Sequence, residues 1–158
     1  MPSDKANPSE NTRSHRHIDD PDSVFKGAHK LQPSDFDQGN YTITNSIDSP
    51  NDVDIWRIHL NAGDTLSVAT DTLDDFTPDT ILSLFDDEGT LLFFDDDSGP
   101  SFESFLEYEA ASSGNYFVAV SSFANFPTGG GDFAHGGPEY NEFGFSTGSY
   151  TLSFDILA

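Results

Sequence analysis

The sequence contains no cysteine, only six lysine and arginine residues in 158, and no long apolar run. The absence of cysteine excludes disulfides, thiolate catalysis and cysteine-ligated zinc or iron–sulfur sites. No stretch approaches the ~20 consecutive apolar residues that a membrane-spanning helix needs. Residues 1–22 are polar and lack the apolar segment of a secretory signal. We therefore expect no membrane insertion, and if the protein is exported, its signal has been removed or it uses another route.

Basic side chains are scarce, and nearly all of them lie near one end of the chain. Residues 1–30 hold five of the six bases and five acids, whereas residues 31–158 hold one base, Arg57, and 23 acids. The net charge of −22 repels phosphate backbones and anionic membranes, so we expect no nucleic-acid binding and look to cations as partners. Composition alone leaves a second interpretation open, in which the acids only keep the protein soluble, for example in a saline habitat.

What the chain does contain is a series of short segments in which apolar and polar residues alternate. Clusters of Gly, Asp, Asn and Pro separate these segments at a spacing of roughly ten residues, which is typical of a sandwich or barrel. The pattern therefore predicts an all-β fold, either a sandwich or a barrel. The predicted strands cover residues 41–44, 53–60, 65–70, 80–85, 91–94, 105–109, 116–120 and 150–156.

The chain length fits one domain. Residues 1–17 are almost entirely polar, so we expect a disordered segment there and a single domain over residues 18–158. Residues 123–149 form an unusually long connection, rich in glycine and aromatic residues. The aromatic rings could form an exposed surface for stacking sugars or peptides, or they could pack the connection onto the sandwich.

Three acidic clusters stand out from the general negative charge, at residues 19–22, 52–54 and 95–97. Residues two apart in an extended chain point to the same side, so the carboxylates of Asp52 and Asp54 repel one another unless a cation lies between them. With one base in residues 31–158, salt bridges cannot relieve that repulsion. Calcium binds six to eight oxygen ligands and accepts them from loops, so Ca²⁺ is the expected ion.

The order of seven motifs resembles the bacterial pre-peptidase C-terminal domain, a β-sandwich that is appended to many secreted proteases and collagenases. These motifs include an acidic Asp-Pro-Asp-Ser segment, an Asp-x-Asp pair at the start of a strand, a Leu-x-Ala-Gly-Asp turn and a closing Gly-x-Tyr-Thr-Leu strand. The matching segments are residues 20–23, 51–58, 60–66, 79–86, 95–97, 113–120 and 148–152.

The resemblance implies an antiparallel, jelly-roll-like β-sandwich of about eight strands. It also implies a calcium site between the first of these segments and the Asp-x-Asp pair. Asp20 stands where the family has glutamate, which withdraws that carboxylate by one methylene group. A second candidate metal cluster lies later in the chain. The ligands implied for the first site are Asp20, Asp22, Ser23, Asp52 and Asp54, and those of the second candidate cluster are Asp79, Asp95, Asp96 and Asp97.

The resemblance also implies a function: a non-catalytic, calcium-binding accessory or adhesion module of an exported protein. Such a module would act outside the cell or at its surface, as a monomer that binds an extracellular protein or polysaccharide. Two alternatives stay open, a purely structural acidic domain without a discrete metal site and a hydrolase that uses two carboxylates. A nucleophile triad would need His59 or His135, and the sequence has neither a Gly-x-Ser-x-Gly nor a His-Glu-x-x-His motif, so we expect no enzyme.

Overall fold

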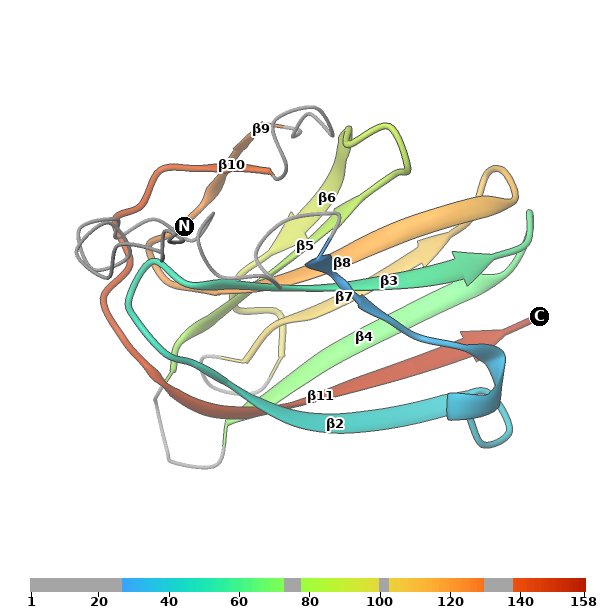
Figure 1. The fold of residues 1–158 in the computed structure, drawn as a ribbon, viewed down its shortest axis with the longest axis horizontal. Helices are drawn as coiled ribbons and strands as arrows, with labels where there is room; N and C mark the ends of the chain where they lie inside the picture. The colour runs from blue at the N-terminus through green and yellow to red at the C-terminus, as the bar shows by residue number, and fades with distance from the viewer. Residues whose placement is uncertain (1–26, 73–77, 100–102, 130–137) are drawn as a thin grey trace, which may run out of the picture.

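Two β-sheets face one another in the computed structural model, which describes residues 27–72, 78–99, 103–129 and 138–158 (Figure 1). Among the described residues, eight strands of five or more residues and one two-residue strand form these sheets, and two further short strands and one 3-10 turn, η4 (Pro33–Asp35), accompany them. The long strands are β2 (Asn40–Ile47), β3 (Val53–Leu60), β4 (Thr65–Thr72), β5 (Thr80–Phe85), β6 (Leu91–Asp95), β7 (Phe105–Glu109), β8 (Gly114–Ser122) and β11 (Gly148–Leu157). The short strands are β1 (His29–Lys30), β9 (Pro127–Gly129) and β10 (Glu139–Tyr140).

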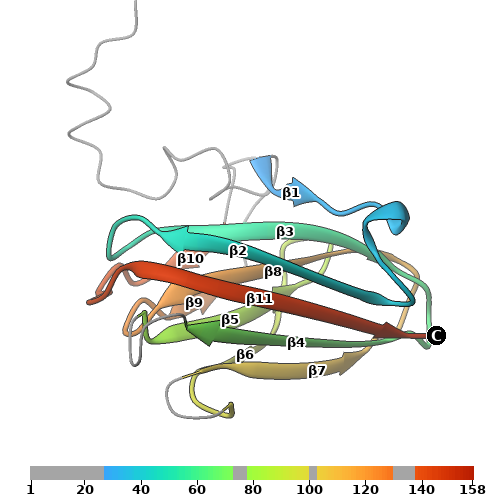
Figure 2. The same ribbon diagram turned by 90° about the horizontal axis from the view of Figure 1, so that it is seen from below.

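The order of the strands is that of a jelly roll. One sheet has the order β1-β3-β8-β5-β6 and the other has the order β2-β11-β4-β7, so most successive long strands alternate between the sheets. All pairs of long strands are antiparallel, and only β1 runs parallel to its neighbour, β3. Figure 2 shows β1 along one edge of the molecule and β7 along the opposite edge. Within the five-stranded sheet, β1 and β6 are the two edge strands. The predicted all-β, jelly-roll-like sandwich is confirmed, and the eight long strands coincide with the eight predicted segments.

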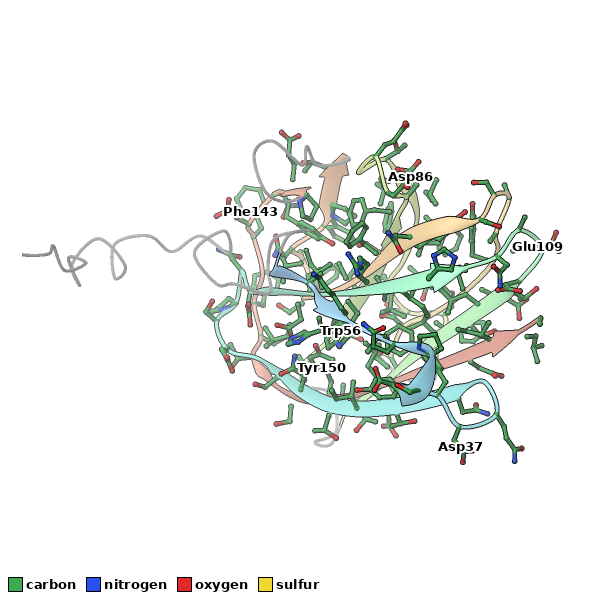
Figure 3. The ribbon with its side chains drawn as sticks, turned by 45° about the vertical axis from the view of Figure 1, so that its right-hand side comes forward. Asp37, Trp56, Asp86, Glu109, Phe143 and Tyr150 are labelled. Carbon is green, nitrogen blue, oxygen red and sulfur yellow. The ribbon has the colours of Figure 1, made fainter. Side chains whose placement is uncertain are left out.

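The main hydrophobic core fills the space between the sheets. Alternate residues of each strand point inward, as the period of a β-strand requires. Trp56 lies at the centre, fully buried, with its ring 6.3 Å from that of Tyr150 and 6.5 Å from that of Phe154. Trp56 and Tyr150 are labelled between the sheets in Figure 3. Large aromatic rings thus make up for the modest apolar content of the chain.

A second, smaller core covers the outer face of the five-stranded sheet. It contains Ile55, Phe85 and Phe117 from the sheet and Tyr140 from β10, whose hydroxyl donates a hydrogen bond of 2.9 Å to the hydroxyl of Ser83. The connection after β8 therefore packs onto the sandwich and contains β9 and β10. Packing onto the sandwich was one of the two interpretations of this connection. Two of its other rings are exposed, with exposed fractions of 69% for Phe143 and 74% for Phe145.

The predicted disordered segment, residues 1–17, lies outside the described residues, as does the expected start of the domain at residue 18.

Candidate metal centre

The hairpin of β5 and β6 brings two distant acidic segments to one end of the sandwich. Leu82 of β5 pairs with Asp95 of β6, and the strands are antiparallel. Asp79 immediately precedes β5, and Asp96 immediately follows β6, so both lie just beyond the same end of the hairpin. The chain positions of these carboxylates differ by 17 residues, yet strand pairing makes them neighbours.

Three carboxylates meet at this end: those of Asp79, Asp96 and Asp97. One oxygen from each lies within 4.8 Å of the others. Two oxygens bound to one calcium ion at about 2.3–2.6 Å can be at most about 5 Å apart, so the spacing suits calcium. The ligand set, all carboxylate oxygen, is the set that a hard cation prefers. Asp97 is exposed and leaves this cluster open to solvent, from which water could complete the coordination.

Two oxygens of the cluster lack hydrogen-bond donors. Oδ1 of Asp79 and Oδ1 of Asp96 are inaccessible to solvent, and no described residue donates a hydrogen bond to either of them. A buried carboxylate oxygen without a donor is costly, and native structures normally satisfy such atoms. A bound cation would satisfy both atoms at once, which makes these oxygens the strongest indication of a metal centre.

The raised pKa values of Asp79 and Asp96 also support a metal centre. Burial, followed by the charge of Asp97, raises the pKa of Asp79 from 3.8 to about 6. Burial raises the pKa of Asp96 further, to about 7, with additional contributions from the charges of Asp97, Asp79 and Asp95 and from a hydrogen bond with Asp97. Burial and neighbouring negative charges make these carboxyl groups harder to ionise in the absence of metal. A divalent cation among them would offset that repulsion and favour the ionised form.

A buried hydroxyl network fixes the backbone beneath the cluster. Ser104 is fully buried, and its hydroxyl lies 2.6 Å from the Asp96 carbonyl oxygen and 2.5 Å from the Thr80 carbonyl oxygen. Its backbone N–H donates to the hydroxyl of Thr70, which in turn lies 2.6 Å from the hydroxyl of Thr80. This network holds the segments that carry Asp79 and Asp96 in a fixed relation. Sequence reasoning missed Ser104, because a serine before an alternating strand carries no distinctive local signal.

The backbone of Asp79 also connects the cluster to the connection after β8. Its carbonyl oxygen accepts a hydrogen bond of 2.7 Å from the N–H of Phe123, and its own N–H donates to the hydroxyl of Ser146 at 3.2 Å. Asp79 thus lies where the five-stranded sheet, the end of β8 and the loop before β11 meet.

Asp95, the fourth member of the second predicted cluster, lies outside the group of mutually close carboxylates. Its carboxylate accepts hydrogen bonds from the backbone N–H groups of Ser98, at 3.1 Å, and Phe105, at 2.9 Å. The hydroxyl of Ser98 also donates to it. Asp95 therefore shapes the turn that presents Asp96 and Asp97, although the sequence alone does not distinguish these adjacent aspartates.

The first predicted site is described only in part. Asp52 and Asp54 are buried at the start of β3, with exposed fractions of 3% and 2%. Asp52 accepts a hydrogen bond of 2.8 Å from the N–H of Asp48, and Asp54 accepts one from the hydroxyl of Tyr150. The other implied ligands lie outside the described residues: Asp20, Asp22 and Ser23.

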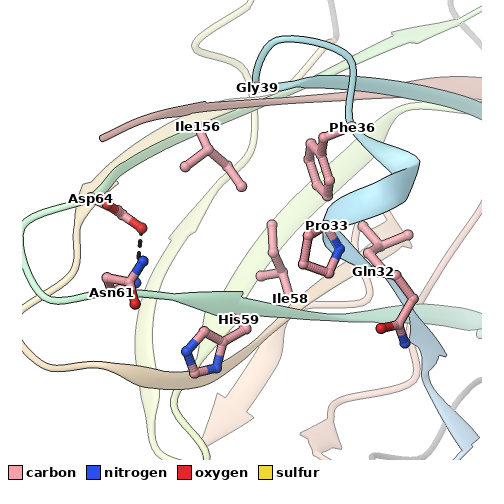
Figure 4. A pocket seen from close by; sticks show the side chains of 10 residues that line it. Gln32, Pro33, Phe36, Gly39, Ile58, His59, Asn61, Asp64 and Ile156 are labelled. Carbon is pink, nitrogen blue, oxygen red and sulfur yellow. Dashed lines mark hydrogen bonds between the residues drawn. The ribbon is translucent and has the colours of Figure 1, made fainter.

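A separate pocket of about 280 Å³ lies at the other end of β3 (Figure 4). Its walls are largely apolar, with Phe36, Ile58 and Ile156 among them, and His59 lies on its rim. Asp64 accepts a hydrogen bond of 2.8 Å from the N–H of Asn61 there. The described lining residues include no serine, threonine or cysteine that could act with His59 as a nucleophile. His135 lies outside the described residues.

The described part of the chain contains no helix of the length and apolar character that crossing a bilayer requires.

Comparison with protein families confirms the resemblance that the sequence motifs indicated. The family model of the bacterial pre-peptidase C-terminal domain matches residues 52–122. The matched segment contains Asp52, Asp54 and all three carboxylates of the cluster, but not the segment at 20–23 or the last strand. No curated protein sequence matches the chain significantly.

Two solved structures with TM-scores above 0.5 share the fold at low sequence identity. PliG of Aeromonas hydrophila, a periplasmic inhibitor of g-type lysozyme, is 14% identical, with a TM-score of 0.55 over 82% of this chain and 96% of that one. PliG of Salmonella Typhimurium, described in the same way, is 15% identical, with a TM-score of 0.52 over 81% of this chain and 96% of that one. The pre-peptidase C-terminal domain of a Bacillus anthracis collagenase is 12% identical, with a TM-score of 0.49 over 82% of this chain and 94% of that one.

Proposed function

Because residues 52–122 match the bacterial pre-peptidase C-terminal domain, we propose that the chain is a non-catalytic, calcium-binding accessory module of an exported protein. The observation that carries the calcium assignment is the pair of buried, donor-free oxygens of Asp79 and Asp96. Asp97 adds a third, exposed carboxylate. In this proposal these side chains hold the ion directly, and the Ser104 network keeps two of them in place.

The proposed ion would act as a structural clamp. Asp79 is bonded through its backbone to the end of β8 and to the loop that carries Ser146. An ion shared by Asp79 and Asp96 would therefore join the open end of the β5–β6 hairpin to that loop. A clamp of this kind stabilises the folded state because the unfolded chain cannot bring the ligands together.

The first predicted site is proposed as a second calcium site. Its support is the resemblance together with the burial of Asp52 and Asp54, which are two residues apart in the chain. It would pin the segment at 20–23 against the start of β3. A shared fold alone does not assign a binding partner, so the partner of the module must be argued from its own surface.

The test is thermal unfolding of the chelator-treated protein with and without calcium. At a calcium concentration about 100-fold above Kd, a single site raises the free energy of unfolding by about 2.7 kcal/mol. For a domain of this size, that corresponds to a rise of roughly 5–10 °C in Tm. We expect Asp96→Asn to lose most of this rise.

The matched control is Asp87→Asn, which removes the same charge from an exposed position at the turn end of the same hairpin. We expect it to keep the full calcium response. An equal response in both variants that persists in about 0.5 M NaCl would place the ion elsewhere. A response in the wild type that disappears in about 0.5 M NaCl would favour the alternative, an acidic domain that gathers only diffuse counterions.

A further inference from the structure

A string of phenylalanine rings crosses the surface beside the carboxylate cluster. The ring centroids of Phe94 and Phe126 are 6.0 Å apart, those of Phe126 and Phe123 are 5.4 Å apart, and those of Phe123 and Phe145 are 6.1 Å apart. We call these four rings the phenyl string. Phe94 comes two residues before Asp96, and the N–H of Phe123 donates to the carbonyl oxygen of Asp79, so the string borders the cluster.

The outer parts of this surface are well exposed. Phe94 has an exposed fraction of 45% and Phe145 of 74%, and Phe143, on the same loop, has one of 69%. Figure 3 shows Phe143 at the periphery of the molecule. Exposed apolar rings that gather in one place, rather than scatter singly, mark interaction surfaces.

The loop that carries these rings is held rigidly. Four successive backbone N–H groups, from residue 142 to residue 145, donate to fixed acceptors: the side chains of Asn125, Asn141 and Asn51 and the carbonyl oxygen of Phe123, at 2.7–3.1 Å. A loop with all of these N–H groups satisfied does not expose its rings through disorder. Pre-organised rings lose little entropy when a partner binds, which favours a binding role.

Charge is distributed unevenly between the two edges of the five-stranded sheet. The bases among the described residues are Lys30 and Arg57, which pair in register on β1 and β3 at one edge. The phenyl string starts at the other edge, with Phe94 on β6, and continues past the end of β8 to the loop that carries Glu142 and Phe145. Asp97 lies in the cluster near its start, and Glu142 lies in the loop at its end. This surface therefore combines aromatic faces with unbalanced carboxylates.

We propose that the phenyl string and its neighbouring carboxylates bind arginine side chains on the surface of a basic partner protein. A guanidinium group stacks on aromatic faces and forms paired hydrogen bonds with carboxylates, and this surface offers both. The inference rests on the proposed function in one respect, namely that the module works by binding. It does not require the calcium ion, since Glu142 lies outside the cluster.

The geometry of the rings argues against a polysaccharide as the occupant. Successive rings in the string are inclined to one another by 69°, 81° and 41°. A sugar chain that stacks on several rings needs them nearly coplanar. Separate guanidinium groups can each use a differently oriented face.

The experiment is calorimetric titration of the full chain with an acetylated (Gly-Arg)₄ amide at about 0.15 M salt, where long-range attraction is largely screened. The comparison peptide replaces each arginine with citrulline, which has nearly the same shape and no charge. We expect the arginine peptide to bind and the citrulline peptide not to bind. The double variant Phe94→Ala/Phe145→Ala should weaken arginine-peptide binding by about tenfold or more.

The matched control is Phe105→Ala, because Phe105 has a similar exposed fraction, 39%, but pairs with Ala69 on the other sheet. It should bind the arginine peptide as the wild type does. Equal binding by the wild type and the double variant would overturn the proposal and leave only the diffuse charge of the protein. Binding of uncharged chitohexaose that depends on Phe94 and Phe145, without binding of the arginine peptide, would also overturn it in favour of a sugar.

Calcium-dependent Tm measured on the same samples separates the two proposals. Arginine-peptide binding without a calcium response would refute the calcium assignment and support this surface. A calcium response without arginine-peptide binding would refute this surface alone.

Discussion

Asp96 combines a buried oxygen without a donor and a strongly raised pKa in one side chain. The hydroxyl of Ser104 is hydrogen-bonded to the carbonyl oxygen of Asp96, so the turn cannot easily shift to expose this carboxylate to solvent. The side chain is therefore either protonated, or charged at a cost to folded stability, unless a cation binds. Asp96 is therefore the residue whose substitution tests the proposed calcium site most directly.

A pH dependence follows from Asp79 and Asp96. The folded protein binds their protons more tightly than the unfolded chain does, because pKa values of about 6 and about 7 lie above the ordinary value of 3.8. Without metal, these groups lower the free energy of unfolding as the pH rises from about 4 to about 7. Calcium must displace these protons at low pH, so we expect its stabilising effect to be larger at pH 7.5 than at pH 5.

Chemical denaturation of the chelator-treated protein across this pH range checks the expectation. Asp96→Asn should lose stability less steeply with rising pH than the wild type, whereas Asp87→Asn should follow the wild type. Parallel curves for the wild type and Asp96→Asn would show that Asp96 does not titrate as described.

At the level of elements, strand alternation was enough to predict the strands and a sandwich or barrel, and the family resemblance was needed to choose the jelly-roll-like sandwich. Eight alternating segments gave eight long strands, and a turn of five residues between β5 and β6 made a hairpin the natural connection. That hairpin places Asp79 and Asp96 at the same end, so their proximity follows from local pattern alone.

Other parts of the site could not be predicted, for a physical reason. Besides its local bonds from Ser98, the Asp95 carboxylate accepts a hydrogen bond from a backbone N–H of β7, and that contact exists only in the folded sandwich. The loop after β10 depends likewise on Asn51, whose side chain accepts a hydrogen bond from Gly144, 93 residues away in the chain. Side-chain bonds over such separations leave no periodic trace in the sequence.

Gly144 provides a test of this long-range anchoring. A Cβ atom at this position would lie 1.7 Å from the carbonyl oxygen of Pro50, so Gly144→Ala must move the loop away from β3. We expect a loss of about 1–3 kcal/mol in the free energy of unfolding, as for other overpacked positions, together with weaker arginine-peptide binding. Urea denaturation and the peptide titration measure the two effects.

The control is Gly114→Ala, where the nearest atom to a Cβ is the Asp87 carboxylate at an ordinary 3.6 Å. Its stability should change by less than about 0.5 kcal/mol. If Gly144→Ala proved equally neutral, the loop would not be held against Pro50.

On the scale of the whole molecule, the sandwich separates its functions by position. The core between the sheets supplies stability, and the outer core holds the connection after β8 against the sheet. The carboxylate cluster and the exposed ring of Phe94 lie at the open end of the β5–β6 hairpin. The negative charge of −22 is not spread evenly, because three carboxylates lie together at one end and two of them have buried oxygens that accept no hydrogen bond from the described residues. Diffuse counterions can screen a uniform coat but cannot satisfy buried oxygens.

The most direct measurement is a crystal structure grown in calcium, with anomalous diffraction used to locate the ion. We predict a peak bounded by oxygens of Asp79, Asp96 and Asp97, at the ~2.3–2.6 Å typical of calcium ligands. Well-ordered carboxylates at this position with no anomalous peak among them, in crystals saturated with calcium, would contradict the account.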